Sequence, residues 1–196
     1  MNIVLATRNK KKVEEIKRIV KDMPVTIYTL DDFPGCPEVV EDGKTFEENA
    51  VKKARAVSKY TKMPALADDS GLEVYALGGA PGVFSARYAG EGTDDRKNYE
   101  KLLKEMNSLP DDERMGKFVC VMALAFSDIR VETFSGYADG TIGKEPKGVN
   151  GFGYDPVFYP KKHERTFAEM PDKEKDLLSH RGAALGRLCA FLKKGL

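Results

Sequence analysis

The chain has 196 residues, 41% of them hydrophobic, and no segment approaches the roughly 20 consecutive apolar residues that span a bilayer, so we expect a soluble protein with no membrane partner. Its 32 basic and 31 acidic residues leave a formal net charge of +1, which argues against a dedicated nucleic-acid surface. The length predicts a single domain over residues 1–196, or two closely packed lobes.

The first half of the chain alternates between strand and helix patterns. Val13, Ile16 and Ile19 recur at helical spacing, and Thr45 with Glu48 forms the capping-box pattern of a helix start. The predicted elements are a strand over 2–7, a helix over 10–21, a strand over 25–29, a proline- and glycine-rich loop over 30–44 and a helix over 45–62.

The second half adds a hairpin and two closing helices. Residues 118–126 are apolar at successive positions, which is typical of a strand covered on both faces, and Ser127 with Asp128 turns the chain back into an antiparallel partner strand. The predicted elements are a short strand over 64–71, a glycine-rich loop over 71–92, a helix over 93–106, strands over 118–126, 129–137 and 157–160, and helices over 171–178 and 180–194. This order predicts an α/β fold with helices packed on a mixed sheet.

A basic segment, LATRNKKKVEE, lies where the first strand ends and the first helix begins. Arg8, Lys10, Lys11 and Lys12 gather at the positive end of that helix, where cations oppose the macrodipole. With Asn9 as the N-cap, the backbone N–H groups of the helix start would suit a phosphate chain. A solvated basic face is the alternative.

Two adjacent carboxylates, Asp68 and Asp69, follow an apolar run. Neighbouring side chains on a strand point to opposite faces, so only one should meet a substrate unless the strand has ended, and Gly71 indicates that it ends there. A carboxylate at a strand end can hold Mg²⁺ or take a proton from water. Ordinary turn chemistry of Asp-Ser-Gly is the alternative.

An acidic loop and a helix face offer further candidates. Glu41 and Asp42 precede the helix capped by Thr45, and Asn49 and Lys53 share one face of that helix at i and i+4. A carboxylate before the helix could contact a metal, and the lysine along it could contact phosphate. Taken alone, this pattern is also typical of a solvated surface.

An aromatic segment, NGFGYDP, places Phe152 between two glycines, followed by Tyr154 and Asp155. An aromatic ring on a thin backbone can stack on a nucleobase, although many tight loops look the same. The segment is not a dinucleotide-binding GxGxxG, because Pro156 stands where the last glycine is needed, and GTIGKE does not have the spacing of a phosphate-binding P-loop.

A group of hydrogen-bond donors lies near the C-terminus. His180 and Arg181 stand at a helix start shortly after Lys175, and these three donors could read carbonyl oxygens. The alternative is a helix capped by Ser179 with exposed charges.

The three cysteines, Cys36, Cys120 and Cys189, fit neither a metal-binding pair nor a disulfide framework, so we interpret them as core or surface thiols. The N-terminal segment lacks the pattern of a secretory signal. The lack of that pattern favours a cytoplasmic location.

Taken together, the ordered motifs TRNKKK, TFEENA, ADDSGL, GGAPGVFSARY, GFGYDP, FAEM and SHRGAAL resemble those of the inosine triphosphate pyrophosphatase family over nearly the whole chain. The resemblance implies an elongated mixed sheet with helices around two lobes and a central cleft, usually in a homodimer. It also implies Mg²⁺-dependent hydrolysis of ITP, dITP or XTP to a monophosphate and pyrophosphate, which cleanses the nucleotide pool.

The resemblance assigns roles to particular residues. The metal ligands would be Glu41 and Asp69, with Asp69 also the catalytic base, while Asp42 and Asp68 stay rival ligands. The substrate-binding residues would be Thr7, Arg8, Asn9, Lys10, Lys11, Lys12, Lys53 and Ser70 toward the phosphates and nucleotide, and Phe152, Gly153, Tyr154, Asp155, Lys175, His180 and Arg181 toward the base.

Physical chemistry adds a mechanism to this assignment. Cations must cover the phosphate oxygens before water can attack in line, so we expect Asp69 to lie close to Lys12, across a trench that takes the phosphates. We hypothesise that Asp69 orients and deprotonates a metal-polarised water. Donors from His180 and Arg181 would bond the C6 carbonyl of hypoxanthine or xanthine and reject the amino group of adenine.

Three other functions are open at this stage: a Maf-type pyrophosphatase acting on modified pyrimidine nucleotides, a nucleotide sensor without catalysis, and an RNA-binding protein. The near-zero net charge weakens the last of these.

Overall fold

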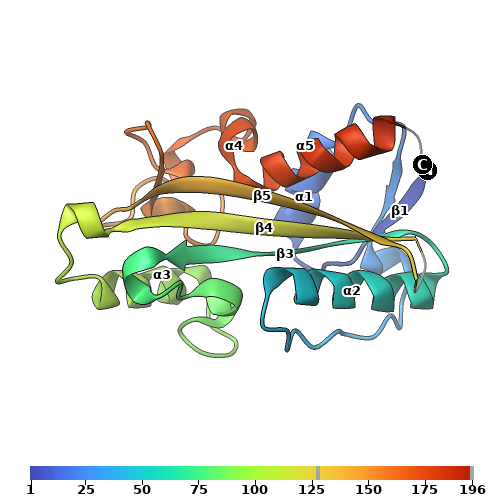
Figure 1. Ribbon diagram of the computed structural model, residues 1–196, viewed down its shortest axis with the longest axis horizontal. Coiled ribbons are helices and arrows are strands. Elements are labelled where there is room, and N and C mark those ends of the chain that lie inside the picture. Colours follow the sequence, from blue (N-terminus) through green and yellow to red (C-terminus); the bar gives the residue numbers. More distant parts are fainter. Residues whose placement is uncertain (127–128, 195–196) are drawn as a thin grey trace. The chain divides into compact units, whose positions relative to one another are not determined.

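The computed structural model describes residues 1–126 and 129–194, so the predicted turn at Ser127 and Asp128 lies outside the described residues. The helices and strands are shown in Figure 1. They are β1 (Asn2–Leu5), α1 (Lys10–Ile19), β2 (Thr26–Tyr28), α2 (Phe46–Thr61), β3 (Ala65–Val74), α3 (Asp95–Glu105), β4 (Met115–Ala125), β5 (Val131–Ile142), β6 (Phe158–Pro160), α4 (Asp172–Leu178) and α5 (His180–Lys193).

The strands form one sheet in the order β2-β1-β3-β4-β5-β6. β1 runs parallel to both β2 and β3, whereas β5 and β6 are antiparallel. The consecutive strands β4 and β5 are neighbours, and their connection over 126–130 is too short for a parallel crossover. The predicted α/β class with a mixed sheet and flanking helices is therefore confirmed.

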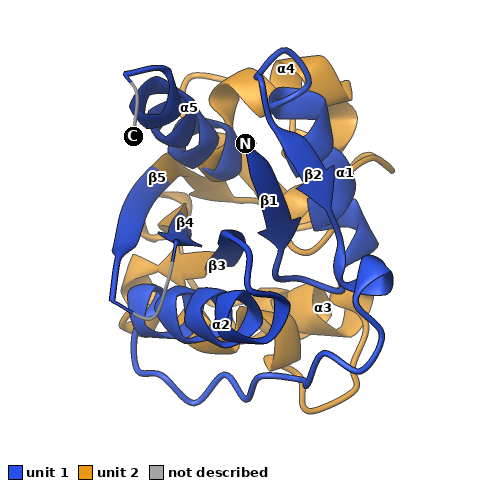
Figure 2. Ribbon diagram, turned by 90° about the vertical axis from the view of Figure 1, so that its right-hand side faces the viewer, with its two compact units in different colours: residues 1–69, 120–136, 181–196 blue, residues 70–119, 137–180 orange. Residues whose placement is uncertain are grey.

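The chain divides into two compact units, coloured separately in Figure 2. Unit 1 comprises Met1–Asp69, Cys120–Gly136 and Arg181–Leu196, and unit 2 comprises Ser70–Val119 and Tyr137–His180. β3, β4 and β5 each contribute residues to both units. The interpretation of residues 1–196 as one domain stays a prediction.

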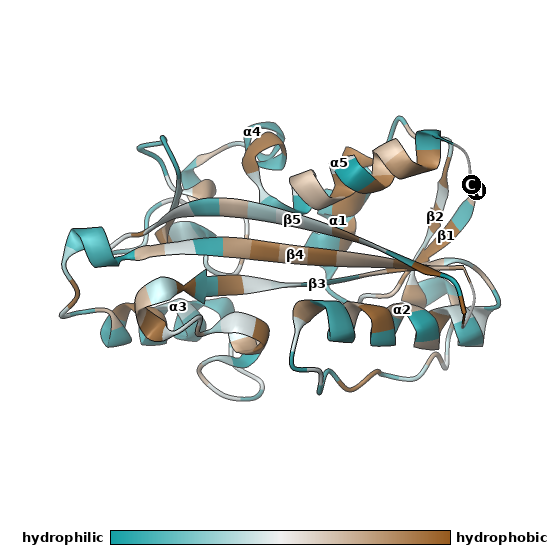
Figure 3. Ribbon diagram, viewed as in Figure 1, coloured by the Kyte–Doolittle hydropathy of each residue, from teal (hydrophilic) through white to brown (hydrophobic). Residues whose placement is uncertain are grey.

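The core of unit 1 is built on alternating strand side chains. Ile3 and Leu5 of β1 pack with Leu66 of β3 against α1 and α5. The intervening residues Val4 and Ala65 are buried on the opposite side of the strands, where Figure 2 shows α2. The strands of unit 1 thus have helices on both faces, which explains their continuous hydrophobicity. Figure 3 shows this as a brown band along β4.

The core of unit 2 is rich in aromatic residues. Leu72 of β3, Phe118 of β4 and Phe158 of β6 pack with Leu102 of α3 and with Met106, the residue that caps the C-terminal end of that helix. The rings of Phe118 and Phe158 lie 4.7 Å apart, within the range of favourable aromatic pairs.

β3 corrects one expectation, because the strand does not end at Gly71 but continues to Val74. Leu72 and Val74 keep the period of two and enter the unit 2 core. Gly71 is needed for close packing instead: a Cβ there would lie 2.4 Å from Ser85 Oγ and 2.6 Å from the Gly82 carbonyl oxygen. β5 likewise continues to Ile142 rather than ending at Tyr137.

The predicted helix starts agree closely with the structure. Asn9 caps α1 by accepting a hydrogen bond from the Lys12 N–H, and Thr45 caps α2 by accepting from the Glu48 N–H. The Glu48 carboxylate accepts from the N–H of Lys44 rather than from that of Thr45, so the capping box is not reciprocal. Among the described residues, no helix has the length and apolar character needed to cross a bilayer.

Candidate active site

Asp68 and Asp69 point to opposite sides of β3, because the strand continues through both of them. Asp68 follows Leu66 and faces the α1 and α5 side, where it meets Lys12 and Arg181. Asp69 faces the α2 side, where it meets Asn49 and Lys53. Two neighbouring carboxylates therefore lie in two different environments.

The α2 side is organised around the ammonium group of Lys53. Its Nζ donates to Glu41 Oε1 at 2.8 Å, to Asp69 Oδ1 at 3.1 Å and to the Asp68 carbonyl oxygen at 2.7 Å. Lys53 is buried on α2, and Glu41 belongs to the loop that leads into that helix. The predicted metal ligands Glu41 and Asp69 thus converge on one cation position.

Burial and charge act against each other in this group. Burial by itself would lower the pKa of Lys53, but the carboxylates of Asp69, Asp68 and Glu41 outweigh it and raise that pKa. Burial raises the pKa of Asp69, and the Glu41 carboxylate adds to this effect, while Lys53 and Lys12 oppose it. Lys53 therefore stays charged, and Asp69 is a better proton acceptor than an exposed aspartate.

Asn49 also contacts Asp69, one helical turn before Lys53. Its Nδ2 donates to Asp69 Oδ2 at 3.1 Å, and its Oδ1 accepts from the Gly43 N–H at 2.8 Å. The sequence placed Asn49 and Lys53 on one helix face but did not indicate that Asn49 contacts Asp69. Only the fold reveals this contact, because the two residues are 20 positions apart.

The other side of β3 carries a buried charge network. Lys12 Nζ lies 2.9 Å from Asp68 Oδ2, and Arg181 Nη2 lies 3.2 Å from the same oxygen. Arg181 also pairs with Glu15 of α1. Burial would raise the pKa of Asp68, but the charges of Lys12 and Arg181 outweigh it and hold that pKa well below its usual range. Asp68 therefore stabilises the cations around it.

The side chains of the basic segment lie in different surroundings. Lys10 and Lys11 are exposed at the start of α1, whereas Lys12 reaches back to Asp68. Arg8 donates to the Cys36 carbonyl oxygen at 2.9 Å, and Thr7 Oγ1 accepts from the Asn9 N–H at 3.2 Å. The direct cationic partner of Asp69 is Lys53, and Lys12 acts on Asp69 through its charge.

The donor set suits a hard divalent cation. Mg²⁺ commonly takes one or two protein carboxylates and completes its octahedron with water and phosphate oxygens. Glu41 and Asp69 supply two such carboxylates. Among the described residues, no group of three or more His, Cys, Asp or Glu side chains could hold a metal. The rival ligand Asp42 forms an exposed pair with Lys52 instead.

A second cluster lies in unit 2 around Asp155. Its Oδ2 accepts from the Phe152 N–H at 2.8 Å and from Lys175 Nζ at 2.7 Å, and that ammonium lies 4.9 Å from the centre of the Phe152 ring. Gly151 has φ +71°, and a Cβ there would lie 2.1 Å from Asp155 Oδ2. The fold thus brings together Phe152, Asp155 and Lys175, to which the family resemblance gives a role in base binding.

Neighbouring contacts hold this aromatic loop in place. The Tyr154 hydroxyl donates to the Ser85 carbonyl oxygen at 2.8 Å, and the Gly153 N–H donates to Asp95 Oδ2 at 2.8 Å. Tyr154 is thus a buried anchor within unit 2. Asp95 and Glu15 are residues that the sequence analysis missed, because each contacts a partner far away in the chain.

His180 and Arg181 are buried, at 4% and 1% exposure, so the alternative of exposed charges at a helix start is wrong. The His180 ring stacks on Phe118 in unit 2, with centres 4.6 Å apart and planes inclined by 7°. The Arg181 guanidinium contacts Glu15 and Asp68 in unit 1. Ser70 lies half-buried on β3, directly after Asp69.

The fold and this arrangement define a mixed α/β protein with acidic and basic side chains paired on both sides of β3. The chain belongs to the Ham1 family, whose family model matches residues 3–191. It is 52% identical to a dITP/XTP pyrophosphatase from Geobacter sulfurreducens over 186 residues, 95% of this chain and 94% of that protein.

A second dITP/XTP pyrophosphatase, from Desulforamulus reducens, is 48% identical over 194 residues, 99% of this chain and 96% of that protein. The solved structure of a HAM1 protein from Coxiella burnetii is 42% identical, covers 100% of both chains and has a TM-score of 0.92. These matches confirm the resemblance drawn from the sequence.

Proposed function

We propose that this protein is a nucleoside triphosphate pyrophosphatase that hydrolyses non-canonical purine nucleotides, namely ITP, dITP and XTP, to the monophosphate and pyrophosphate. The observation that carries the proposal is the convergence of Glu41 and Asp69 on the ammonium of Lys53. The relatives named dITP/XTP pyrophosphatases support the substrate class.

The α2 side of unit 1 would perform the chemistry. Glu41 and Asp69 would hold Mg²⁺, which when bound neutralises phosphate oxygens and polarises water. Lys53 would then turn its charge toward a phosphate oxygen, and the first N–H groups of α1 would bind the phosphate chain. Asp69 takes the proton of the attacking water, a role favoured by the burial that raises its pKa.

The Asp155 cluster of unit 2 would read the base. A purine stacked on Phe152 would meet the ammonium of Lys175, which lies over that ring. This donor and His180 would favour a carbonyl at C6 and disfavour the amino group of adenine. For Arg181, contact with the base would compete with its ion pairs to Glu15 and Asp68.

A substrate panel tests the proposal directly. ITP, dITP, XTP, GTP and ATP would be incubated with the protein and Mg²⁺, with released pyrophosphate as the readout. We expect the first three to be hydrolysed much faster than the last two. Activity confined to modified pyrimidine nucleotides would indicate a Maf-type enzyme, and nucleotide binding without hydrolysis would indicate a sensor.

Asp69→Asn tests the catalytic assignment. The amide cannot accept the proton of water, so we expect kcat for ITP to fall by at least about 100-fold, the lower end of a general base's contribution. Nucleotide affinity, measured by calorimetry with Ca²⁺ in place of Mg²⁺, should change little. A variant with a near-normal rate would exclude Asp69 as the base.

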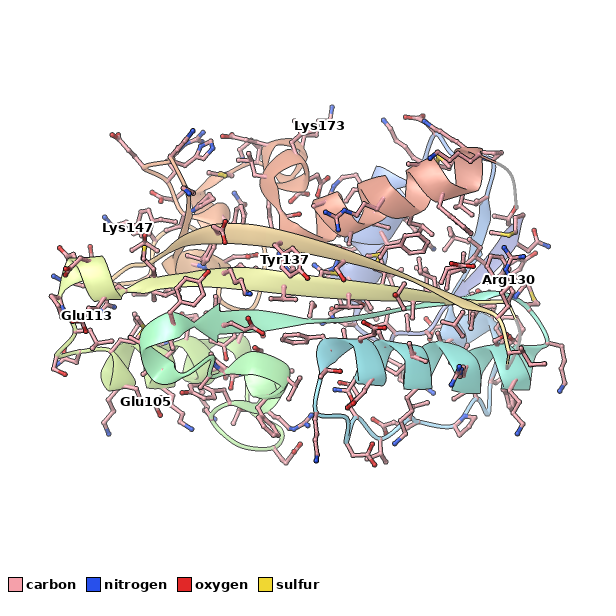
Figure 4. The ribbon with its side chains drawn as sticks, viewed as in Figure 1. Glu105, Glu113, Arg130, Tyr137, Lys147 and Lys173 are labelled. Atoms are coloured by element: carbon pink, nitrogen blue, oxygen red, sulfur yellow. The ribbon has the colours of Figure 1, made fainter. Side chains whose placement is uncertain are left out.

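We also infer that the protein is a homodimer in the cytoplasm. The strands of unit 2 carry exposed apolar side chains. Met115 on β4 is 52% exposed. Tyr137 on β5, labelled in Figure 4, is 51% exposed, and the centre of its ring lies 5.5 Å from the Lys117 ammonium. Such side chains can support a contact between copies. Light scattering that reports the mass of one chain would contradict the dimer.

A further inference from the structure

We propose that Asn49 is a positioning residue that fixes the Asp69 carboxylate relative to the loop carrying Glu41. The inference rests on the proposed function, in which Glu41 and Asp69 hold the metal. It concerns a residue that contacts neither phosphate nor water in that scheme and acts through its two hydrogen bonds.

The two oxygens of Asp69 have separate donors on α2. Oδ1 accepts from Lys53 at 3.1 Å, and Oδ2 accepts from Asn49 at 3.1 Å. Two donors one helical turn apart fix the plane of the carboxylate as well as its position. When Lys53 turns toward a phosphate, Asn49 keeps Asp69 in place without adding a charge that would repel a metal ion.

The same amide holds the acidic loop. Asn49 Oδ1 accepts from the N–H of Gly43, two residues after Glu41, at 2.8 Å. A Cβ at Gly43 would lie 2.6 Å from that oxygen and 2.9 Å from Glu48 Cβ, so the loop backbone lies directly against α2. The position of Gly43, and with it that of Glu41, is therefore tied to Asn49.

The chemistry at this position requires an amide. Asn49 is 1% exposed and uses a donor on one side and an acceptor on the other. An aspartate would still accept from Gly43, but it would place a second carboxylate against Asp69. An alanine would leave both Asp69 and the loop N–H with one partner fewer in a buried place.

A double-mutant cycle in the metal-free protein tests the contact without any enzymatic readout. Urea unfolding in EDTA would be measured for wild type, Asn49→Asp, Asp69→Asn and the double variant, which restores one donor facing one acceptor. We expect Asn49→Asp to lower the folding equilibrium constant more in the wild-type background, where it faces Asp69, than in the Asp69→Asn background. The difference should be at least about tenfold, a coupling typical of residues in contact.

Two results of the cycle would overturn the proposal. One is an equal loss from Asn49→Asp in both backgrounds, which would give Asn49 a merely space-filling role. The other is a double variant that fails to fold although Asp69→Asn alone folds. If Asn49→Asp alone is unfolded, recovery of folding in the double variant supports the proposal.

A second experiment, on activity and metal binding, compares Asn49→Ala and Gly43→Ala with Asn98→Ala as a matched control. Asn98 is also a buried asparagine at 2% exposure, but its amide bonds to backbone groups of Ala86 and Ala89 in unit 2. We expect Asn49→Ala and Gly43→Ala to lower kcat about tenfold or more, with the KM for ITP changed less than about threefold. The Mn²⁺ concentration for half-maximal binding, followed by EPR, should rise in both.

Asn98→Ala should lower stability but leave the Mn²⁺ midpoint unchanged. If Asn98→Ala shifts that midpoint as much as Asn49→Ala does, or if Asn49→Ala shifts neither kcat nor the midpoint, the positioning role is excluded. The proposed function fails separately: wild-type protein that hydrolyses no nucleotide would overturn it, while the metal-free cycle would still test the contact between Asn49 and Asp69.

Discussion

Single residues in this protein owe their chemistry to the side of a strand on which they lie. Asp68 and Asp69 are identical side chains at adjacent positions, yet the pKa of Asp68 is lowered and that of Asp69 is raised. Both are buried, so the difference comes from neighbouring charges: Lys12 and Arg181 lower the pKa of Asp68, whereas the Glu41 carboxylate adds to the effect of burial on Asp69. A proton acceptor and a structural anion are thus made from the same residue type.

Cys120, which lies in the core of unit 1 on β4, makes the stability of the folded protein depend on pH. Burial, with the Asp68 carboxylate adding to it, raises the pKa of the Cys120 thiol to about 12. A thiol in the unfolded chain ionises near pH 8.5, so between these values the folded state binds the extra proton. The stability from this group is therefore complete below about pH 8 and is lost as the pH rises toward 12.

Cys120→Ala should accordingly flatten the decline of the unfolding free energy between about pH 9 and pH 11, measured by urea denaturation at each pH. Cys189→Ala serves as the control, since Cys189 is only half-buried. Parallel declines for wild type and Cys120→Ala would contradict the assignment.

At the scale of elements, β3 positions the site because it keeps its pleat through the two carboxylates and beyond. Its first half lies between α2 and the helices α1 and α5, and its second half enters the aromatic core of unit 2. Gly71 lies where β3 passes from the first of these environments to the second, and it packs against Ser85 and Gly82. The glycine permits a close approach of backbones in an unbroken strand.

Gly71→Ala should destabilise the protein by about 1–3 kcal/mol, the usual cost of forcing an extra methyl group into a packed site. Gly186→Ala on α5 is the control, because among the described residues a Cβ there would meet nothing within 4 Å beyond its chain neighbours and its own helix backbone. We expect that control to be stabilising by about 0.5–1 kcal/mol, as alanine favours helix over glycine. Thermal and urea unfolding check both, and a neutral Gly71→Ala would argue against tight packing there.

At the scale of the whole molecule, the two units carry different parts of the proposed reaction. The Lys53 group in unit 1 gathers the carboxylates and cations that phosphoryl chemistry needs. The Asp155 cluster in unit 2 combines an aromatic ring with a buried ammonium. Variants in the two units should therefore affect different kinetic constants.

Phe152→Ala tests this division of roles. Stacking of a base on an aromatic ring is worth about 1–3 kcal/mol, so we expect KM for ITP to rise roughly 5- to 150-fold while kcat changes much less. Tyr60→Ala, which removes an aromatic residue that is 44% exposed on α2, should leave KM unchanged. Steady-state kinetics decide the matter, and a loss confined to kcat would place Phe152 outside base binding.

Much of the fold was predictable because its signals are local. The helices α1 and α2 follow from apolar spacing and from caps a few residues away, and the hairpin strand β4 follows from an unbroken apolar run. The end of β3 was predicted wrongly, because Gly71 indicates a turn when only its chain neighbours are considered. Its actual neighbour, Ser85, is 14 positions further along the chain.

The helices, the mixed sheet, the family resemblance and the candidate residues could be inferred from the sequence, since they depend on residue types at short spacings. The partner of each charge is fixed by the folded chain alone. Arg181 reaches Asp68 across 113 positions and Glu15 across 166, and Lys53 reaches Asp69 across 16. Such contacts form when packing encloses the charges, because a buried charge needs a partner and the fold determines which one lies nearby.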